Sequence, residues 1–483
     1  MSSKSRIKLF IENIIVYGLG GVISKIVPLI MLPILTRLYP NSEYLGLNDL
    51  SYNLISIVTA IAVCGMYDAM FRLFFDNNEL VYQKRVCSTA LIFVICTTII
   101  CAIILLLLQG NIAKYYFLSE KYKHLTCITV LGFLVTATNQ VISAPTRIQN
   151  KRKVFLITNT MSPLISYVVA IPLILNGYNI VAMPIAMVIS GITLEIVFFC
   201  LNHKFFTFKC FDKTLLIDLL KIGIPLLPNF LVYWIYNSSD KVMIAHILST
   251  ADTGIYSVAS RIGHISNLIY TAFAGGWLFF AYSTMNDKDQ VQLKSRIFEY
   301  LTAISFCATI ILASCSKLMF ELLFPNEYLD GYIVAPYLFL APLMLMLYQV
   351  IANQFTIVKK TYMNLIALSV GAIVNVAFNL FMIPKMGIEG ASLATIIGYH
   401  ISVAFCFVLL LRRKLIMFNK KLSVSIILFT AYAVSWRLLF HDRIVISFIM
   451  GIIFSSAFIA LYYKNISVVL KKIFFKNNKL STK

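Results

Sequence analysis

The chain has 483 residues, of which 60% are hydrophobic and only 13% are charged. Soluble domains average about 45–50% apolar and 25% charged residues, so this composition excludes an ordinary soluble protein. The formal net charge of +21 is high enough to suggest a nucleic-acid partner. However, the basic residues flank apolar stretches and form no contiguous basic domain. We therefore expect no nucleic-acid binding, and we interpret the basic residues as anchors that face anionic lipid headgroups.

About fourteen apolar stretches follow one another along the chain, most of them near the ~20 residues that cross a bilayer as a helix. This pattern predicts an all-α integral membrane protein with about 14 transmembrane helices. The basic N-terminus lacks a small-residue cleavage site, so we expect the first span to be a retained helix. The predicted spans are 11–36, 44–71, 87–108, 125–146, 154–175, 180–201, 221–248, 253–284, 297–316, 332–357, 362–383, 389–411, 422–439 and 444–463.

The gaps between these spans alternate between basic clusters and segments with little positive charge. About 30 of the 41 Lys and Arg residues fall on one side of the predicted membrane, and about eight fall on the other. Cytoplasmic loops carry the excess of positive charge, and an even number of spans places both ends on one side. Both termini are therefore predicted to be cytoplasmic.

The loops between spans are short, which limits the chemistry that they can hold. No gap exceeds about 20 residues, so no soluble catalytic or nucleotide-binding domain fits between spans. The sequence has no Walker A motif, and its ten cysteines show no CxxC or other metal-ligand spacing. We therefore expect no enzyme activity, no cofactor and no metal site.

Two pairs of similar segments indicate an internal repeat. Gly46 and Gly254 each open a span after a short polar turn, and they are 208 residues apart. Gly177 and Gly387 lie in similar turns and are 210 residues apart. The shared offset predicts two six-helix lobes in a parallel, pseudo-two-fold arrangement, with two extra C-terminal helices. The predicted domains are an N-terminal lobe (1–210), a C-terminal lobe (211–415) and two further helices with a basic cytoplasmic tail (416–483).

Three basic residues lie inside spans, where an uncompensated charge costs at least ~2.5–3.5 kcal/mol. They are Lys25, Lys241 and Arg261. Asp240 and Arg261 lie at a similar depth on adjacent helices, roughly 15 Å below the outer surface. One interpretation is a structural Asp240–Arg261 ion pair. The other is that Lys241 or Arg261 faces a cavity and binds an anionic substrate, and both can hold at once.

Other intramembrane acids have simpler explanations. Asp49 opens the second span and is expected to be a solvated, helix-terminal acid. Asp68 and Arg72 are spaced i,i+4 and are expected to form a local salt bridge. Glu195 is a lone acid in the sixth span and could carry a proton. Asp240, Asp68 and Glu195 are thus the candidates for ion pairing or ion coupling.

Prolines in the first and seventh spans, which are repeat partners, suggest hinges. Proline kinks a helix because it removes one hydrogen bond. The hinge candidates are Pro28, Pro33, Pro225 and Pro228. Several spans also carry Asn and Gln, which form interhelical hydrogen bonds or line a hydrated cavity that binds sugars.

Three segments resemble the polysaccharide flippases of the multidrug/oligosaccharidyl-lipid/polysaccharide exporter superfamily. YGLGGVISKIVPLIMLPILTRLYPNSEYLGLNDL is similar to their first helix hairpin. SSDKVMIAHILSTADTGIYSVASRI is similar to their seventh and eighth spans, and NLFMIPKMGIEGASLATIIGY to their eleventh and twelfth. The resemblance covers essentially the whole chain and does not identify the sugar.

The resemblance implies a function, a location and partners. The substrate would be an undecaprenyl-diphosphate-linked oligosaccharide, such as an O-antigen repeat unit of lipopolysaccharide. The protein would move it from the cytoplasmic to the periplasmic leaflet of the bacterial inner membrane by alternating access. Family members carry a cationic central cavity, which Lys25, Lys241 and Arg261 would supply here. Besides this substrate and the membrane lipids, the expected partners are a polysaccharide polymerase and a chain-length regulator.

Three alternatives remain open. A multidrug or organic-cation antiporter of the same superfamily would favour acids and aromatics in its cavity. A peptidoglycan precursor flippase shares the topology and would differ in the charges of the first lobe. A membrane polysaccharide polymerase would need a large outer loop, which this sequence lacks.

Overall fold

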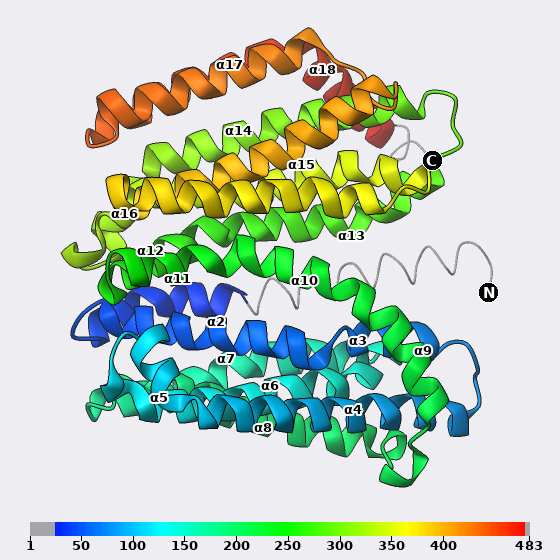
Figure 1. Ribbon diagram of the computed structural model, residues 1–483. Helices are drawn as coiled ribbons and strands as arrows, with labels where there is room; N and C mark the ends of the chain where they lie inside the picture. Colours follow the sequence, from blue (N-terminus) through cyan, green and yellow to red (C-terminus); the bar gives the residue numbers. More distant parts are fainter. Residues whose placement is uncertain (1–24, 479–483) are drawn as a thin grey trace.

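The protein is a bundle of long helices. The computed structural model describes the backbone of residues 25–478, with side chains through 463 except those of 275, 278 and 279. Every regular element in these residues is a helix (Figure 1). A helix satisfies its own backbone hydrogen bonds, which lipid cannot do, so apolar stretches of this length fold as helices. The start of the predicted first span and the basic N-terminus lie outside the described residues.

The N-terminal half forms one packed group of helices, which is the lower group in Figure 1. Helices α6 and α8 pack along each other, and α4 and α7 cover them. The described part of the first helix covers residues 25–38. The other helices of this half are α2 (Glu43–Val63), α3 (Met66–Leu73), α4 (Leu80–Leu107), α5 (Gln109–Asn111), α6 (Lys123–Ile148), α7 (Arg152–Leu175) and α8 (Ala182–Asn202).

The C-terminal half forms the upper group in Figure 1. Its centre is α15, which packs between α14, α16 and α12 and is the most completely buried of the apolar helices. The helices of this half are α9 (Lys213–Gly223), α10 (Leu227–Trp234), α11 (Asp240–Ile247), α12 (Thr250–Gly263), α13 (Asn267–Ser283), α14 (Gln290–Leu323), α15 (Gly331–Ile357), α16 (Tyr362–Arg412), α17 (Lys420–Ser435) and α18 (Ile444–Asn478).

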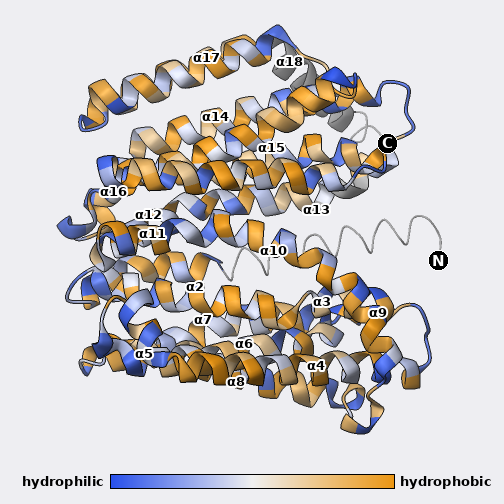
Figure 2. Cartoon of the chain, in the orientation of Figure 1, coloured by the Kyte–Doolittle hydropathy of each residue, from blue (hydrophilic) through white to orange (hydrophobic). Residues whose placement is uncertain are grey.

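The helices account for the predicted spans. Within the described residues, eleven helical stretches are long and apolar enough to cross a membrane. The 51-residue α16 contains two of the predicted spans, because Gly387 breaks it with φ 60° and ψ −142°. The pair α12–α13 and the first helix complete the predicted set. The structure therefore confirms an all-α membrane protein with roughly 14 helices, and Figure 2 shows the apolar residues along their lengths.

The two turn glycines that indicated a repeat both have a positive φ. Gly177 has φ 85° and Gly387 has φ 60°. Residues with a Cβ rarely adopt positive φ, so both turns favour glycine for the same steric reason.

Helix α9 packs on the N-terminal group, although it was predicted to open the second lobe. It lies against α3 and α4, and Leu219 is fully buried in the N-terminal core. In packing terms the chain crosses between the groups after Gly223, twelve residues later than the predicted start at 211. The interruption between α9 and α10 marks this crossing (Figure 1).

The last two helices lie on the outside of the C-terminal group. Both α17 and α18 pack against α14, and they form the orange and red edge in Figure 1. The hydroxyl groups of Tyr432 in α17 and Ser314 in α14 form a 2.8 Å hydrogen bond. This edge lies away from the contact between the two groups.

Candidate functional site

The two groups, hereafter the N-lobe and the C-lobe, meet most closely where α2 lies against α12. An ideal Cβ on Gly46 would collide with the carbonyl oxygen of Thr250, and one on Gly254 would collide with that of Ser42. Ser42 and Gly46 precede Thr250 and Gly254 by the repeat offset of 208 residues. The contact is therefore symmetric, as a pseudo-two-fold axis between the lobes requires. It lies at the predicted outer end of the molecule.

Further hydrogen bonds join the lobes at this end. The backbone N–H of Ser42 donates to Glu327 Oε1 at 2.7 Å. The ring Nε2 of His246 lies 2.7 Å from the carbonyl oxygen of Tyr115. Two clusters of buried apolar side chains at this end draw members from both lobes. The predicted outer end is therefore closed.

Asp49 is the centre of an ion cluster between the lobes. Its Oδ1 accepts a hydrogen bond from Arg261 Nη2 at 2.8 Å, and its Oδ2 accepts one from Lys241 Nζ at 2.5 Å. Ser257 Oγ also donates to Oδ2 at 2.5 Å. Asp49 is only 5% exposed. The prediction that Asp49 is a solvated terminal acid is wrong, because α12 covers this end of α2.

The predicted Asp240–Arg261 ion pair is also wrong, because each residue has other partners. Asp240 is 3% exposed, and four neutral side chains donate hydrogen bonds to its carboxylate. Tyr256 Oη donates to its Oδ2 and Asn379 Nδ2 to its Oδ1, each at 2.7 Å. Asn375 and Thr395 complete the ring of donors. All these groups belong to α11, α12 and α16, so the site lies wholly within the C-lobe.

A cavity of about 430 Å³ lies between α2, α3, α6, α8 and the seventh span, where it is lined by α10 and residues 237–238. It begins near Tyr52, one turn along α2 from Asp49, and extends to Asp68 near the predicted inner end. Its wall alternates apolar residues with hydroxyls, amides and aromatic rings. The polar and aromatic lining residues are Tyr52, Ser56, Thr59, Tyr67, Asp68, Thr136, Gln140, Phe230, Tyr233, Trp234, Asn237 and Ser238.

A second cavity of about 480 Å³ adjoins the first within the N-lobe. The two share Tyr67, Thr136, Gln140 and Met187 in their linings, so they are neighbours separated only by these side chains. Arg147 Nη1 donates to Tyr67 Oη at 3.0 Å in its wall. The other polar lining residues are Asn139, Ser143, Thr146, Thr158, Asn159, Ser162, Ser166 and Ser190.

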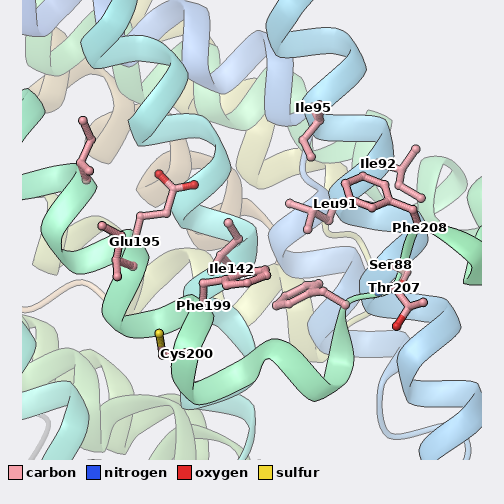
Figure 3. Close-up of a pocket in the computed structure, with 13 residues that line it drawn as sticks. Ser88, Leu91, Ile92, Ile95, Ile142, Glu195, Phe199, Cys200, Thr207 and Phe208 are labelled. Carbon is pink, nitrogen blue, oxygen red and sulfur yellow. The ribbon is translucent and has the colours of Figure 1, made fainter.

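A third pocket has a different character and contains Glu195. It lies between α4, α6, α8 and residues 206–208, and its lining is mostly Ile, Leu and Phe (Figure 3). Ile196 and Phe199 in its wall are exposed at the molecular surface. Glu195 therefore faces an apolar crevice at the side of the N-lobe and does not line the space between the lobes.

The remaining predicted residues fall in separate places. Lys25 is exposed, at the start of the described residues. Lys25, Lys241 and Arg261 do not line any of these three cavities. The predicted Asp68–Arg72 salt bridge is wrong, because Arg72 pairs with Asp76 one turn further on, and Asp68 faces the cavity between the lobes.

The prolines of the seventh span coincide with a 3₁₀ turn inside the helical stretch Lys213–Ile247. Pro225 lies in a 3₁₀ turn between α9 and α10, and Pro228 lies in the first turn of α10. By contrast, Pro28 and Pro33 lie within the continuous helix of residues 25–38. This turn lies against the junction between α2 and α3. An ideal Cβ on Gly65, at that junction, would lie 2.6 Å from the carbonyl oxygen of Gly223.

A sequence profile described as "polysaccharide biosynthesis protein" matches residues 34–335, which is more than half of the chain. The chain belongs to this family. A comparison with curated proteins gave no match.

Solved structures share the fold of this polysaccharide biosynthesis protein. The lipid II flippase MurJ in an inward closed conformation has a TM-score of 0.71 and 17% identity, over 94% of this chain and 99% of that one. An inward-facing multidrug resistance MATE transporter has a TM-score of 0.66 and 14% identity, over 84% and 94%. A Pyrococcus furiosus transporter, whose title reports a binding pocket of reverse polarity, has a TM-score of 0.54 and 14% identity, over 83% and 95%.

These comparisons confirm the resemblance predicted from the sequence. The protein is a multi-pass polysaccharide biosynthesis protein with the fold of MurJ and the MATE transporters. The closed outer end fits the inward states named in two of the titles. The low identities show the fold alone and do not identify the substrate.

Proposed function

We propose that the protein moves an undecaprenyl-diphosphate-linked oligosaccharide, such as an O-antigen repeat unit, from the cytoplasmic to the periplasmic leaflet. The two lobes would alternate between inward and outward openings around a central site. The polyprenyl tail would stay in lipid while the diphosphate and the glycan cross inside the protein. The protein would thus serve lipopolysaccharide synthesis at the bacterial inner membrane, with both termini in the cytoplasm.

The two adjoining cavities between α2, α6, α7 and the seventh span, with the polar side chains in their walls, carry this proposal. Asn139, Gln140 and Asn159 supply amides, which donate to and accept from sugar hydroxyls. Tyr67, Tyr233 and Trp234 supply aromatic faces, which pack on the apolar faces of sugar rings. Polar groups are costly inside a membrane protein unless they pair or face water, so this concentration of them favours a hydrated ligand.

The basic residues would bind the diphosphate. Lys241 and Arg261 lie one turn beyond the end of the first of these cavities, beside Asp49. Arginine and lysine are the side chains that suit phosphate groups best. Lys25 is a further candidate for this role.

The buried Asp240 is our candidate for ion coupling. Its carboxylate accepts hydrogen bonds from four neutral side chains, and none of these four neutralises its charge. A proton or a small monovalent cation bound there would supply the missing charge. Binding and release of that ion would link the conformation of the C-lobe to an ion gradient. Asp68 and Glu195 are weaker candidates because Asp68 is exposed and Glu195 is only half-buried, whereas Asp240 is buried.

The alternatives differ in what they require of the cavity. An organic-cation antiporter needs acids where its ligand sits, and Asp68 is the one acid in the cavity between the lobes. A peptidoglycan precursor flippase needs the same fold and the same diphosphate, so it differs only in the glycan. A polymerase would need an outer active-site loop. A polysaccharide polymerase and a chain-length regulator are instead our proposed partners, acting on the product.

Deletion of the gene in its host tests the proposal. The lipid-linked oligosaccharide should accumulate, the surface glycan should disappear, and the wild-type gene should restore both. Mass spectrometry of the lipid fraction and immunoblotting of the glycan measure these outcomes. Normal glycan with altered lipid II would instead indicate a peptidoglycan precursor, and altered drug tolerance alone would indicate an antiporter.

A further inference from the structure

The Asp49 cluster contains more positive than negative charge. The carboxylate of Asp49 comes from the N-lobe, while Lys241 and Arg261 both come from the C-lobe. The side chains of the three residues are 7%, 14% and 27% exposed, respectively. The single carboxylate therefore serves two largely buried cations, and the cluster carries a net charge of about +1 at neutral pH.

Separation of the lobes at the outer end would break this cluster. Asp49 would move away with α2, and the two cations would remain with α11 and α12. Removing one partner from a buried ion pair typically costs about 3–5 kcal/mol, because the remaining charge stays uncompensated. Opening of the outer end therefore costs less when another anion takes the place of Asp49.

A diphosphate meets this need better than a carboxylate does. A diester of diphosphate carries two negative charges and several acceptor oxygens, so it can neutralise Lys241 and Arg261 together. Arginine and lysine form strong, charge-assisted hydrogen bonds with phosphate oxygens. The cluster is also within reach of a ligand, since Tyr52 of the central cavity lies one turn along α2 from Asp49.

We propose that Asp49 is an internal competitor of the substrate's diphosphate for the cations of Lys241 and Arg261. In the closed state Asp49 occupies the anion site and fastens the lobes together at the outer end. When the diphosphate arrives, it displaces Asp49 and releases the outer end. The idea rests on the proposed function and adds a role for Asp49, a positioning residue that couples occupancy of the site to opening.

Binding of inorganic pyrophosphate to the full-length protein in nanodiscs tests this competition. Asp49→Asn removes the competitor, so pyrophosphate should bind about tenfold more tightly than to the wild type. Lys241→Gln and Arg261→Gln should each weaken binding. Glu321→Gln is the matched control, because it removes an acid that pairs with Lys317 in α14. It should leave the affinity unchanged. Equal or weaker binding to Asp49→Asn would overturn the proposal.

Hydrogen–deuterium exchange supplies a second readout, which measures opening of the outer end and does not require a binding constant. Asp49→Asn should speed exchange several-fold at residues 43–50 and 250–257, and pyrophosphate should do the same in the wild type. If Asp49→Asn does not fold, the swap Asp49→Lys with Lys241→Asp keeps an ion pair and should preserve slow exchange. Rapid exchange in a folded swap variant, or no effect of pyrophosphate on the wild type, would contradict the proposed role of Asp49.

Two ligand arms separate this proposal from the proposed function. Undecaprenyl diphosphate in the nanodisc and free pyrophosphate both present a diphosphate group, one from the lipid and one from water. If both compete with Asp49 but the deletion strain keeps a normal surface glycan, the proposed role of Asp49 stands and the proposed substrate is wrong. If neither competes while the glycan is lost, the proposed function stands and the proposed role of Asp49 is wrong.

Discussion

Gly46 of α2 and Gly254 of α12 lie against each other across the contact between the lobes, and neither position leaves room for a side chain. Replacing Gly254 with Leu would force the outer ends of the lobes apart. We expect Gly254→Leu to shift the protein away from the closed state and to reduce glycan export at least tenfold. Surface glycan per unit of membrane-inserted protein measures the effect.

A second glycine provides the control for this prediction. Gly276 lies in α13, and an ideal Cβ there has no neighbour within 4 Å. Gly276→Ala should therefore export glycan at the wild-type level. Normal export by Gly254→Leu would show that the contact between α2 and α12 is not needed for transport.

Asp240→Asn should uncouple transport from the ion gradient. The substitution keeps the shape of the side chain and removes the negative charge that would hold the ion. We expect a flipping rate that no longer responds to a proton or sodium gradient imposed across proteoliposomes. Varying the two gradients separately identifies the ion. A variant that responds as the wild type does would exclude Asp240 from coupling.

Pro225 and Pro228 should be needed for the lobes to move. Replacing both with Ala allows one continuous helix to form where α9 and α10 are now separated by a 3₁₀ turn. We expect several-fold slower flipping, with normal membrane insertion. Pro172→Ala, which changes a proline inside the continuous helix α7, is the control and should have little effect on the rate. Equal rates for the double variant and this control would argue against a hinge.

Arg437 and Glu389 should stabilise the attachment of the thirteenth span to the C-lobe. Two hydrogen bonds join them, from Nε to Oε1 at 2.5 Å and from Nη2 to Oε2 at 2.7 Å. Because the Arg437 side chain is 34% exposed, we expect Arg437→Ala to cost only about 1–2 kcal/mol of stability. A lower Tm in detergent would show this. Arg437→Lys cannot form both bonds and should be intermediate, and an unchanged Tm for Arg437→Ala would contradict the account.

The sequence predicted the fold well because the bilayer constrains it strongly. Span length follows from bilayer thickness, and charge asymmetry sets the topology. The turn glycines at 177 and 387 could be paired because positive φ restricts both positions to glycine. The position of α9 could not be predicted, because an apolar helix next to a lobe boundary can pack on either lobe.

The ion cluster was missed because depth in the membrane does not determine which helices are neighbours. Asp240 and Arg261 share a depth, yet Asp240 faces α16 while Arg261 faces α2. The internal repeat contained information about this contact. Asp49 and Ser257 are 208 residues apart, the offset that aligns Gly46 with Gly254, and they form a hydrogen bond across the lobes. Equivalent residues close to a pseudo-two-fold axis must lie close to each other, so Asp49 could have been placed beside α12.

Flipping by the purified protein in proteoliposomes tests the central claim most directly. Undecaprenyl-diphosphate oligosaccharide would be placed in both leaflets, and its arrival in the outer leaflet would be followed with a membrane-impermeant glycan-binding protein. The account predicts translocation by the wild type and at least tenfold less by Asn139→Leu with Gln140→Leu, which removes two cavity amides. No translocation by folded wild-type protein under any ion gradient would contradict the claim.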